Sequence, residues 1–377
     1  MHRLLCLATA TLVSAPLAAQ QAPPAWAAAT AAFDAYARVD STVGGALVFM
    51  NENGIAAEHY LGFADRANGV RAGGRTIWHW GSITKTLTAV AIMQQVERGK
   101  IRLDQSILEL VPELHRIHNP FGPMSTITVR HLLSHSSGLQ AGTWPWSRGE
   151  SWEPFEPTEW AQLVAMMPYM KVNFVPGSRY GYSNPGVVYL ARAIERVTGD
   201  SWQSYIAKNL FLPLEINGAY FGATPYHLAP FRSHNYAVTQ TGLVDHGAEF
   251  DPGITIPNGG LNASIADLSR WLGFLMRGTN NPDAPVLPRA TLESMWQPVV
   301  RVNAEEEMGL SFFLRNENGQ RLVGHTGTQA NFRSFFWLNP ATRTAIIGVV
   351  NTSSDVDGAR STAGFNEVMA AARRVLQ

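Results

Sequence analysis

The stretch Gly44-Gly45-Ala46-Leu47-Val48-Phe49-Met50 leads into the turn-like sequence Asn51-Glu52-Asn53-Gly54 and a second apolar stretch, residues 55–63. Apolar runs on both sides of an Asn/Gly turn predict a β-hairpin. Strand patterns return near the other end of the chain, at residues 309–315, 321–325, 332–338 and 344–350. Turn sequences rich in Asn, Gly and Pro separate several of these strands, which predicts antiparallel neighbours.

Helical patterns occupy most of the remaining sequence. Residues 23–40 are alanine-rich, roughly 102–255 show helical patterns broken by Pro- and Gly-rich loops, and a last helix is expected at about 357–376. The simplest topology is one antiparallel sheet built from both ends of the chain, with a helical region inserted. The predicted class is therefore α+β, with an α/β part at about 25–101 and 256–377 and a mainly helical part at about 102–255.

Composition narrows the function classes. The 377 residues carry 29 basic and 29 acidic side chains, and 46% of the residues are apolar. A net charge of zero, without any block of like charge, argues against a nucleic-acid partner. A small-molecule or peptide substrate is the partner that this composition favours.

The N-terminus has the pattern of an export signal. Arg3 precedes an apolar run at residues 4–13, and small residues follow up to Ala19. This order predicts a secretory signal peptide, residues 1–19, and a secreted or periplasmic protein with no membrane span. Cys6, the single cysteine, would be removed with the signal. A cysteine nucleophile, a disulfide and a thiolate metal site are then excluded in the mature chain.

The first candidate motif is Gly81-Ser82-Ile83-Thr84-Lys85, which opens an apolar run at helical spacing that ends at Gly99. Positions i and i+3 of a helix share a face, so the Lys85 amine can reach the Ser82 hydroxyl. A lysine whose pKa is lowered by burial or by a nearby charge can remove the serine proton. A helix-cap serine with a solvated lysine is the alternative, but the chain has only four lysines and this setting is apolar.

The second candidate motif is Tyr180-Gly181-Tyr182-Ser183-Asn184-Pro185-Gly186, in a loop that enters a helical run at 187–197. A tyrosine there can relay protons, and an asparagine amide can bind a substrate carbonyl. A packed aromatic beside a turn-forming asparagine is the alternative. The stretch narrowly misses the Gly-x-Ser-x-Gly elbow of α/β-hydrolases, which disfavours an esterase that uses Ser183 but keeps it as a rival.

The third candidate motif is Gly324-His325-Thr326-Gly327-Thr328, between two predicted strands. Glycine in this position lets a ligand lie alongside the backbone of a sheet edge. The alternative is a strand-end turn with an incidental histidine.

Together, Ser82-x-x-Lys85, Tyr182-x-Asn184 and His325-Thr326-Gly327 resemble, in order and approximate separation, the three motifs of the penicillin-recognising serine hydrolases. The resemblance is to the branch with class C β-lactamases, D-alanyl-D-alanine carboxypeptidases, D-aminopeptidases and β-lactamase-like esterases. Residues 127–139 look like the segment that this branch carries between its first two motifs, and residues 259–268 look like a later segment. The similarity runs from about residue 30 to 375.

The resemblance implies a role for each matching residue. Ser82 would be the acylated nucleophile, and Lys85 and Tyr182 would share the general acid–base work. The residues that would bind substrate are Asn184, His325, Thr326, Gly327 and Thr328. The backbone N–H groups of Ser82 and Thr328 would form the oxyanion hole, because a tetrahedral oxyanion needs two preorganised donors. The resemblance also implies a β-lactamase/transpeptidase-like fold with the site in a cleft, and no cofactor is expected.

The histidine of the third motif bears on the substrate. Most β-lactamases of this group have Lys-Thr-Gly there, whereas His325 is mostly neutral at pH 7 unless its pKa is perturbed. The expected function is a secreted serine acyl hydrolase that cleaves D-amino-acid peptides or small carboxylic esters. A class C-like β-lactamase and a non-catalytic module with a penicillin-binding fold are the alternatives. A peptidoglycan stem peptide and a β-lactam are therefore among the candidate substrates.

Two further patterns have open interpretations. Four tryptophans lie between Trp144 and Trp160 and either line the cleft or pin a surface loop. His131 and His135 are four residues apart, a spacing that can place two imidazoles on one helix face. No third ligand is evident, so a structural role is expected and no metal site is predicted.

Overall fold

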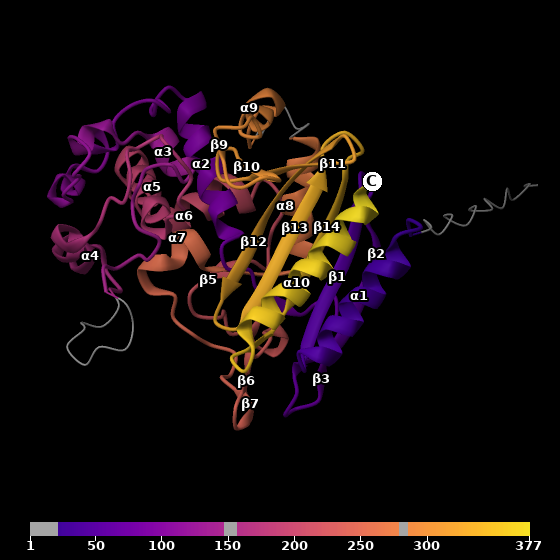
Figure 1. The fold of residues 1–377 in the computed structure, drawn as a ribbon. Coiled ribbons are helices and arrows are strands. Elements are labelled where there is room, and N and C mark those ends of the chain that lie inside the picture. The colour runs from indigo at the N-terminus through magenta and orange to yellow at the C-terminus, as the bar shows by residue number, and fades with distance from the viewer. Residues whose placement is uncertain (1–21, 147–156, 279–285) are drawn as a thin grey trace, which may run out of the picture.

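The computed structural model describes residues 22–146, 157–278 and 286–377 (Figure 1). The predicted signal peptide and the centre of the tryptophan-rich loop lie outside these ranges. No helix within them combines the length and apolar character that crossing a membrane requires.

The two ends of the chain build one antiparallel sheet of nine strands, in the order β3-β2-β1-β14-β13-β12-β11-β10-β9. The predicted first hairpin is confirmed, and its β1 lies against β14, with Val48 opposite Ile347. The strands of this sheet are β1 (Gly44–Asn51), β2 (Gly54–Asp65), β3 (Val70–Arg71), β9 (Val300–Arg301), β10 (Glu306–Met308), β11 (Phe313–Glu317), β12 (Gln320–Gln329), β13 (Phe332–Asn339) and β14 (Thr344–Val350).

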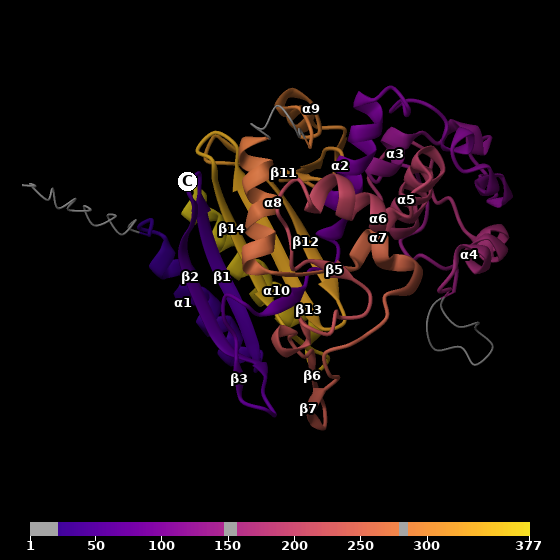
Figure 2. The ribbon, with the colours of Figure 1, turned by 180° about the vertical axis from the view of Figure 1, so that it is seen from behind.

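Both faces of the sheet are covered, because alternate residues of the central strands point to opposite sides. On β1, Leu47 and Phe49 pack with α1 (Trp26–Val39) and α10 (Gly358–Arg373) in one apolar cluster. Ala46 and Val48 belong to the second, larger cluster, together with α8 (Ile265–Arg277) and α2 (Thr84–Glu97). Figure 1 shows α1 and α10 across one face, and Figure 2 shows α8 across the other.

The helical region lies beside the sheet (Figure 1). Its helices are α3 (Val129–Leu133), α4 (Trp160–Met166), α5 (Asn184–Thr198), α6 (Trp202–Ile206) and α7 (Ile256–Gly259), and α9 (Arg289–Ser294) follows later in the chain. Short strands complete the fold as two small sheets, with β4 (Ile77–His79), β5 (Tyr220–Phe221) and β8 (Leu261–Ser264) in one and β6 (Tyr236–Thr239), β7 (Gly242–Asp245) and β15 (Thr352–Ser354) in the other.

One detail of the predicted elements is wrong. The strand expected at 309–315 begins only at Phe313, because Ser311 has a φ of +62° and donates its backbone N–H to Leu133 in the helical region. The stretch at 102–255 also contains β5, β6 and β7, which are two to four residues long. The exposed β7 has no apolar face for a sequence pattern to reveal.

Helix α2 positions the first motif at the centre of the molecule. Its residues from Thr84 to Gln95 are all buried, so the helix has no solvent-facing side. Such a helix must pair its polar groups internally, and Thr86 and Thr88 donate to the carbonyls of Ile83 and Pro257. A lysine on this helix is therefore held away from water.

Candidate active site

Lys85 and Ser82 are in hydrogen-bond contact. The Lys85 Nζ lies 2.9 Å from the Ser82 Oγ and donates to the carbonyl of Asn258 at 2.8 Å. The Lys85 side chain is fully buried, and this burial holds the pKa of its amine well below the usual value. A neutral amine keeps one lone pair, so the Ser82 hydroxyl can donate its proton to Nζ.

Gly81 brings the turn that carries Ser82 against the backbone of β12. Gly81 has a φ of +52°, a conformation that suits glycine. A Cβ at this position would lie 2.9 Å from the backbone nitrogen of Thr328. A Cβ on Gly327 would lie 2.0 Å from the carbonyl oxygen of Trp80. Both glycines thus allow two backbones to approach, and the amide of Thr328 comes beside the turn that holds Ser82.

The free edge of β12 explains why the Thr328 end of the strand can face a ligand. Strand β11 pairs with β12 only from Gln320 to Gly324, whereas β13 continues along the other side to Gln329. Among the described residues, the edge beyond Gly324 therefore has no neighbouring strand on the side of the helical region.

Tyr182 of the second motif lies against Lys85 and Ser82. The Lys85 Nζ is 5.0 Å from the centre of the Tyr182 ring. Burial raises the pKa of the Tyr182 hydroxyl, while a hydrogen bond with the Ser82 side chain opposes the rise. The pKa values of the two groups are therefore shifted in opposite directions. The tyrosine keeps its proton at neutral pH, and deprotonation of the lysine is favoured.

Asn258 joins the first two motifs and was missed in the sequence. Its carbonyl accepts from Lys85, and its side-chain Nδ2 donates to the carbonyl of Asn184 at 3.2 Å. Asn258 directly precedes the Gly259-Gly260-Leu261 segment that carries part of the family resemblance, and this position was the only available signal.

A cavity of about 410 Å³ opens at Ser82. The residues that line this Ser82 cavity are Ser82, Gly142, Thr143, Trp144, Asn184, Phe250, Asp251, Pro252, Thr255, Asn258, Gly259, Thr328, Gln329 and Ala330. It contains one predicted residue from each motif, namely Ser82, Asn184 and Thr328. Trp144, from the tryptophan-rich loop, contributes to its wall, as one of the two interpretations of that loop expected. Phe250 and Gln329 also line it, and no sequence motif points to either residue.

The other residues of the third motif lie elsewhere on β12. His325 is fully buried and is not among the residues that line the Ser82 cavity, and its role in substrate binding stays a prediction. Its Nδ1 donates to the carbonyl of Thr326 at 2.6 Å, and burial, aided by the charge of Lys85, lowers the pKa of His325 to about 3. Thr326 and Gly327 line a separate groove on the outer face of the sheet, beside Arg333. Thr328 borders both spaces.

His131 and His135 do not share a helix face, contrary to the arrangement that their spacing allows. Helix α3 ends at Leu133, and His135 has a φ of +54°, which turns the chain away. His131 accepts the backbone N–H of Thr128 at 3.3 Å, as part of a helix cap. His135 points into the protein and packs on Tyr182, with ring centres 4.4 Å apart.

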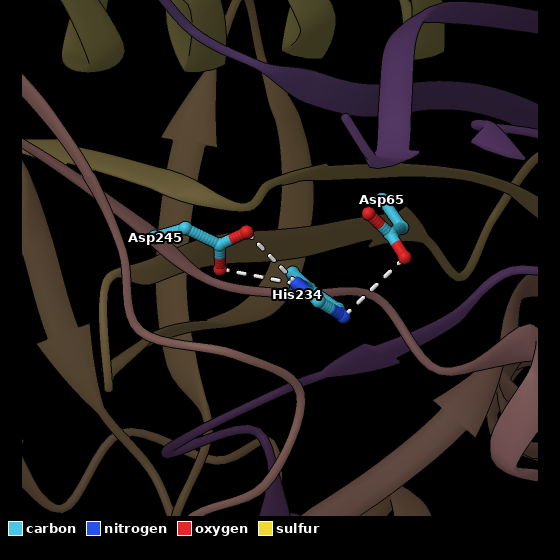
Figure 3. Close-up of side chains that lie close together, drawn as sticks. All are labelled: Asp65, His234 and Asp245. Atoms are coloured by element: carbon cyan, nitrogen blue, oxygen red, sulfur yellow. Dashed lines mark hydrogen bonds and ion pairs between the residues drawn. The ribbon is translucent and has the colours of Figure 1, made fainter. Parts of the chain in front are cut away.

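A cluster of Asp65, His234 and Asp245 is the one group of possible metal ligands found among the described residues (Figure 3). The His234 Nδ1 lies 3.0 Å from Asp245 and its Nε2 lies 3.5 Å from Asp65. One ligand atom from each residue lies within 4.8 Å of the other two, and the two ring nitrogens of His234 face different carboxylates. The contacts tie the end of β2 to the β6–β7 hairpin.

The sequence and the fold were compared with those of known proteins. Protein flp from Staphylococcus aureus (strain COL) is 26% identical over 313 residues, which are 82% of this chain and 60% of that protein. The chain thus spans about 60% of the length of this curated relative.

Two solved structures share the fold. The octameric penicillin-binding protein homologue from Pyrococcus abyssi has a TM-score of 0.74 and 26% identity, over 87% of this chain and 73% of that chain. The D-amino acid amidase from Ochrobactrum anthropi SV3, complexed with D-phenylalanine, has a TM-score of 0.75 and 20% identity, over 93% of this chain and 98% of that chain.

The family model described as Beta-lactamase matches residues 29–367, nearly the whole of the described chain. The fold and the predicted superfamily are therefore confirmed, and the chain belongs to the beta-lactamase family.

Proposed function

We propose that this protein is a serine acyl hydrolase that forms an acyl-enzyme on Ser82 and cleaves D-amino-acid peptides or amides and small carboxylic esters. The observation that carries the proposal is the 2.9 Å contact between the Ser82 Oγ and a fully buried Lys85 amine. A buried lysine without its proton is a general base, and a serine beside it is the group that it activates.

In the first half of the reaction, Lys85 takes the proton of Ser82 while Oγ bonds to the carbonyl carbon of the substrate. The carbonyl oxygen becomes an oxyanion and accepts hydrogen bonds from the backbone N–H groups of Ser82 and Thr328. Tyr182, whose pKa burial raises, donates a proton to the departing amine or alkoxide, and the proton on Lys85 replaces it. The bond to the leaving group breaks, and the acyl group stays on Ser82.

In the second half, a water molecule attacks the acyl-enzyme. The same pair of side chains takes one proton from the water and returns one to Ser82, which releases the carboxylic acid. Asn184 lines the cavity beside Ser82, and in this proposal its side-chain amide orients the acyl group.

The charge of the Ser82 cavity favours amide and ester substrates over β-lactams. Asp251 is the one charged side chain among the residues that line this cavity. A β-lactam carries a carboxylate, as does a peptide that ends in D-Ala-D-Ala, and neither Asp251 nor a neutral, buried His325 attracts one. Among the D-amino compounds, amides without a free carboxylate are therefore favoured over a D-Ala-D-Ala peptide. The amidase relative complexed with D-phenylalanine supports a small acyl group whose side chain packs against aromatic walls such as Trp144 and Phe250.

Two rival functions, a non-catalytic binding module and an esterase that uses Ser183, require a different chemistry from the proposed one. A binding module without catalysis does not require a lysine amine to be buried against a serine, because such burial is costly unless it is used. An esterase that uses Ser183 is disfavoured, because the Ser183 Oγ accepts the N–H of Gly186 as the cap of α5, and the side chain is buried.

The test is a substrate panel with wild type, Ser82→Ala and the matched control Ser183→Ala. The panel contains p-nitrophenyl butyrate, a D-amino acid amide, a D-Ala-D-Ala peptide and nitrocefin. We expect hydrolysis of the ester or the D-amino compounds, its loss in Ser82→Ala, and its retention in Ser183→Ala. A kcat/KM for nitrocefin on the order of 10⁶ M⁻¹s⁻¹ would overturn the substrate preference. Activity lost only in Ser183→Ala would overturn the assignment of Ser82 as the nucleophile.

Export is part of the same proposal and rests on the first 19 residues. Expression of the full chain in a bacterial host, followed by N-terminal sequencing of the periplasmic fraction, should give a protein that begins at Gln20. Recovery of the intact N-terminus from the cytoplasm would contradict export.

A further inference from the structure

His135 touches the second motif at three points. Its backbone carbonyl accepts the N–H of Gly181 at 2.8 Å, and its ring Nδ1 accepts the N–H of Ser183 at 3.2 Å. Between these two contacts, its imidazole packs on the ring of Tyr182, with centres 4.4 Å apart and planes 31° apart. Both neighbours of Tyr182, and the ring itself, are therefore held by a single residue.

The backbone of His135 is fixed in a conformation that few non-glycine residues adopt. Its φ of +54° follows the end of α3, and the next residue, Ser136, donates to the carbonyl of His131 at 2.9 Å and accepts from Gly177 at 2.7 Å. A non-glycine residue is strained in this region and persists there only where the surroundings enforce it. Here they enforce a contact with Tyr182.

The contact with Ser183 also defines the charge state of the imidazole. A backbone N–H can donate only to a ring nitrogen that carries no proton, so Nδ1 is the acceptor and the proton sits on Nε2. Protonation of Nδ1 would break this bond. Burial, and then the repulsion that a protonated Lys85 or His325 would exert, hold the pKa of His135 well below its usual value.

The groups that surround His135 come from three other elements. They are Lys85 on α2, His325 on β12, and Tyr180 and Tyr182 before α5. None of these groups is a carboxylate, so the environment gives no charge that would stabilise an imidazolium.

We propose that His135 is the positioning residue for Tyr182, which holds the tyrosine hydroxyl toward Ser82 and Lys85 by its Nδ1 contact with Ser183 and its ring contact with Tyr182. This inference rests on the proposed function. It assigns His135 no contact with substrate, since its side chain is fully buried and lines no wall of the Ser82 cavity.

The test compares two substitutions of His135 with one at His131. His135→Asn keeps an acceptor near the position of Nδ1 and tolerates the positive φ, whereas His135→Ala removes the acceptor and the ring. His131→Ala is the matched control, because the His131 Nδ1 also accepts a backbone N–H, 3.3 Å away, but the residue lies outside the site. Each variant is first checked for native circular dichroism and a cooperative thermal transition.

We expect kcat for p-nitrophenyl butyrate to fall about 100-fold in His135→Ala with KM within twofold, because a proton donor moved by about 1 Å fails mainly in the transition state. His135→Asn should recover at least a tenth of the wild-type kcat, and His131→Ala should keep nearly all of it. The acid limb of the kcat profile should also move to higher pH in His135→Ala, where water reaches the Lys85 amine and raises its pKa.

The inference is overturned if folded His135→Ala keeps the wild-type kcat and pH profile, or if His135→Asn loses as much kcat as His135→Ala. If His135→Ala does not fold, the comparison of His135→Asn with wild type and ¹⁵N chemical shifts of wild-type His135 decide. A proton on Nδ1 would then overturn the inference. Failure of the proposed function is separate, because it appears as wild-type protein that a fluorophosphonate does not label at Ser82.

Discussion

The substitution Gly81→Ala tests how the oxyanion hole is built, because it changes no side chain that takes part in the chemistry. Gly81 has a φ of +52°, and its missing Cβ would lie 2.9 Å from the nitrogen of Thr328 and 3.2 Å from its carbonyl carbon. An alanine in this conformation costs roughly 1–2 kcal/mol in backbone strain. The contact also pushes apart the two backbone segments that carry the proposed oxyanion donors.

Displacing one oxyanion donor is expected to cost about as much transition-state stabilisation as deleting it. Removal of one oxyanion donor costs about 2.7–4 kcal/mol in the transition state, so kcat/KM should fall roughly 10²–10³-fold. Gly99→Ala is the matched control, because Gly99 has a φ of +67° and open space where the Cβ would be. Both variants should lose a similar amount of stability from strain, and only Gly81→Ala should lose activity.

The assay is initial-rate hydrolysis of p-nitrophenyl butyrate by wild type and both variants, with thermal unfolding of each. A folded Gly81→Ala with the wild-type kcat/KM would refute the argument that the close approach of Gly81 and Thr328 builds the site. An equal loss of activity in Gly99→Ala would refute it as well, since general strain would then explain the effect.

Three further outcomes follow from the site. Lys85→Met should lower kcat/KM by about 10²–10⁴-fold without lowering the thermal midpoint, because it removes a buried amine together with the general base; retained activity would contradict the role of Lys85. Ser183→Ala should leave kcat/KM within threefold and cost about 1 kcal/mol of unfolding free energy, measured by urea denaturation, because it removes only the cap of α5. Acid should destabilise the fold. Burial is the main cause that lowers the pKa of His325 to about 3 and of His79 to about 4. Below pH 6.5 these histidines therefore bind protons in the unfolded chain but stay neutral in the folded chain. Stability should fall by about 2 kcal/mol for each histidine between pH 7 and pH 5, and equal urea midpoints at the two pH values would contradict this.

The elements that the sequence predicted are those whose residues face an apolar core on one or both sides. The hairpin at 44–63, the strands at 332–338 and 344–350 and the helix at the C-terminal end all have this property, and each is present. The late start of β11 at Phe313 was not predictable, because it depends on Ser311, whose N–H bonds Leu133, a residue 178 positions earlier in the chain.

The site was predictable where it depends on side chains at fixed spacing. The spacing of Ser82 and Lys85 places them on one turn, and their contact is present. Asn258 holds Lys85 through a backbone carbonyl, which any residue possesses, so residue type gives no signal for this role. The burial of His325 depends on which face of β12 it occupies. The place of His135 depends on a positive φ after α3, which a four-residue spacing cannot reveal.

The most direct measurement of the central claim is the mass-spectrometric location of a covalent adduct after reaction with a fluorophosphonate. Trypsin releases Ser82 in the peptide of residues 76–85, between Arg75 and the bond after Lys85. We predict one adduct, on Ser82 of this peptide. In Lys85→Met, where the tryptic peptide extends to Arg98, the same adduct should form at least about 100-fold more slowly. An adduct on Ser183 or any other residue, with Ser82 unmodified, would contradict the account.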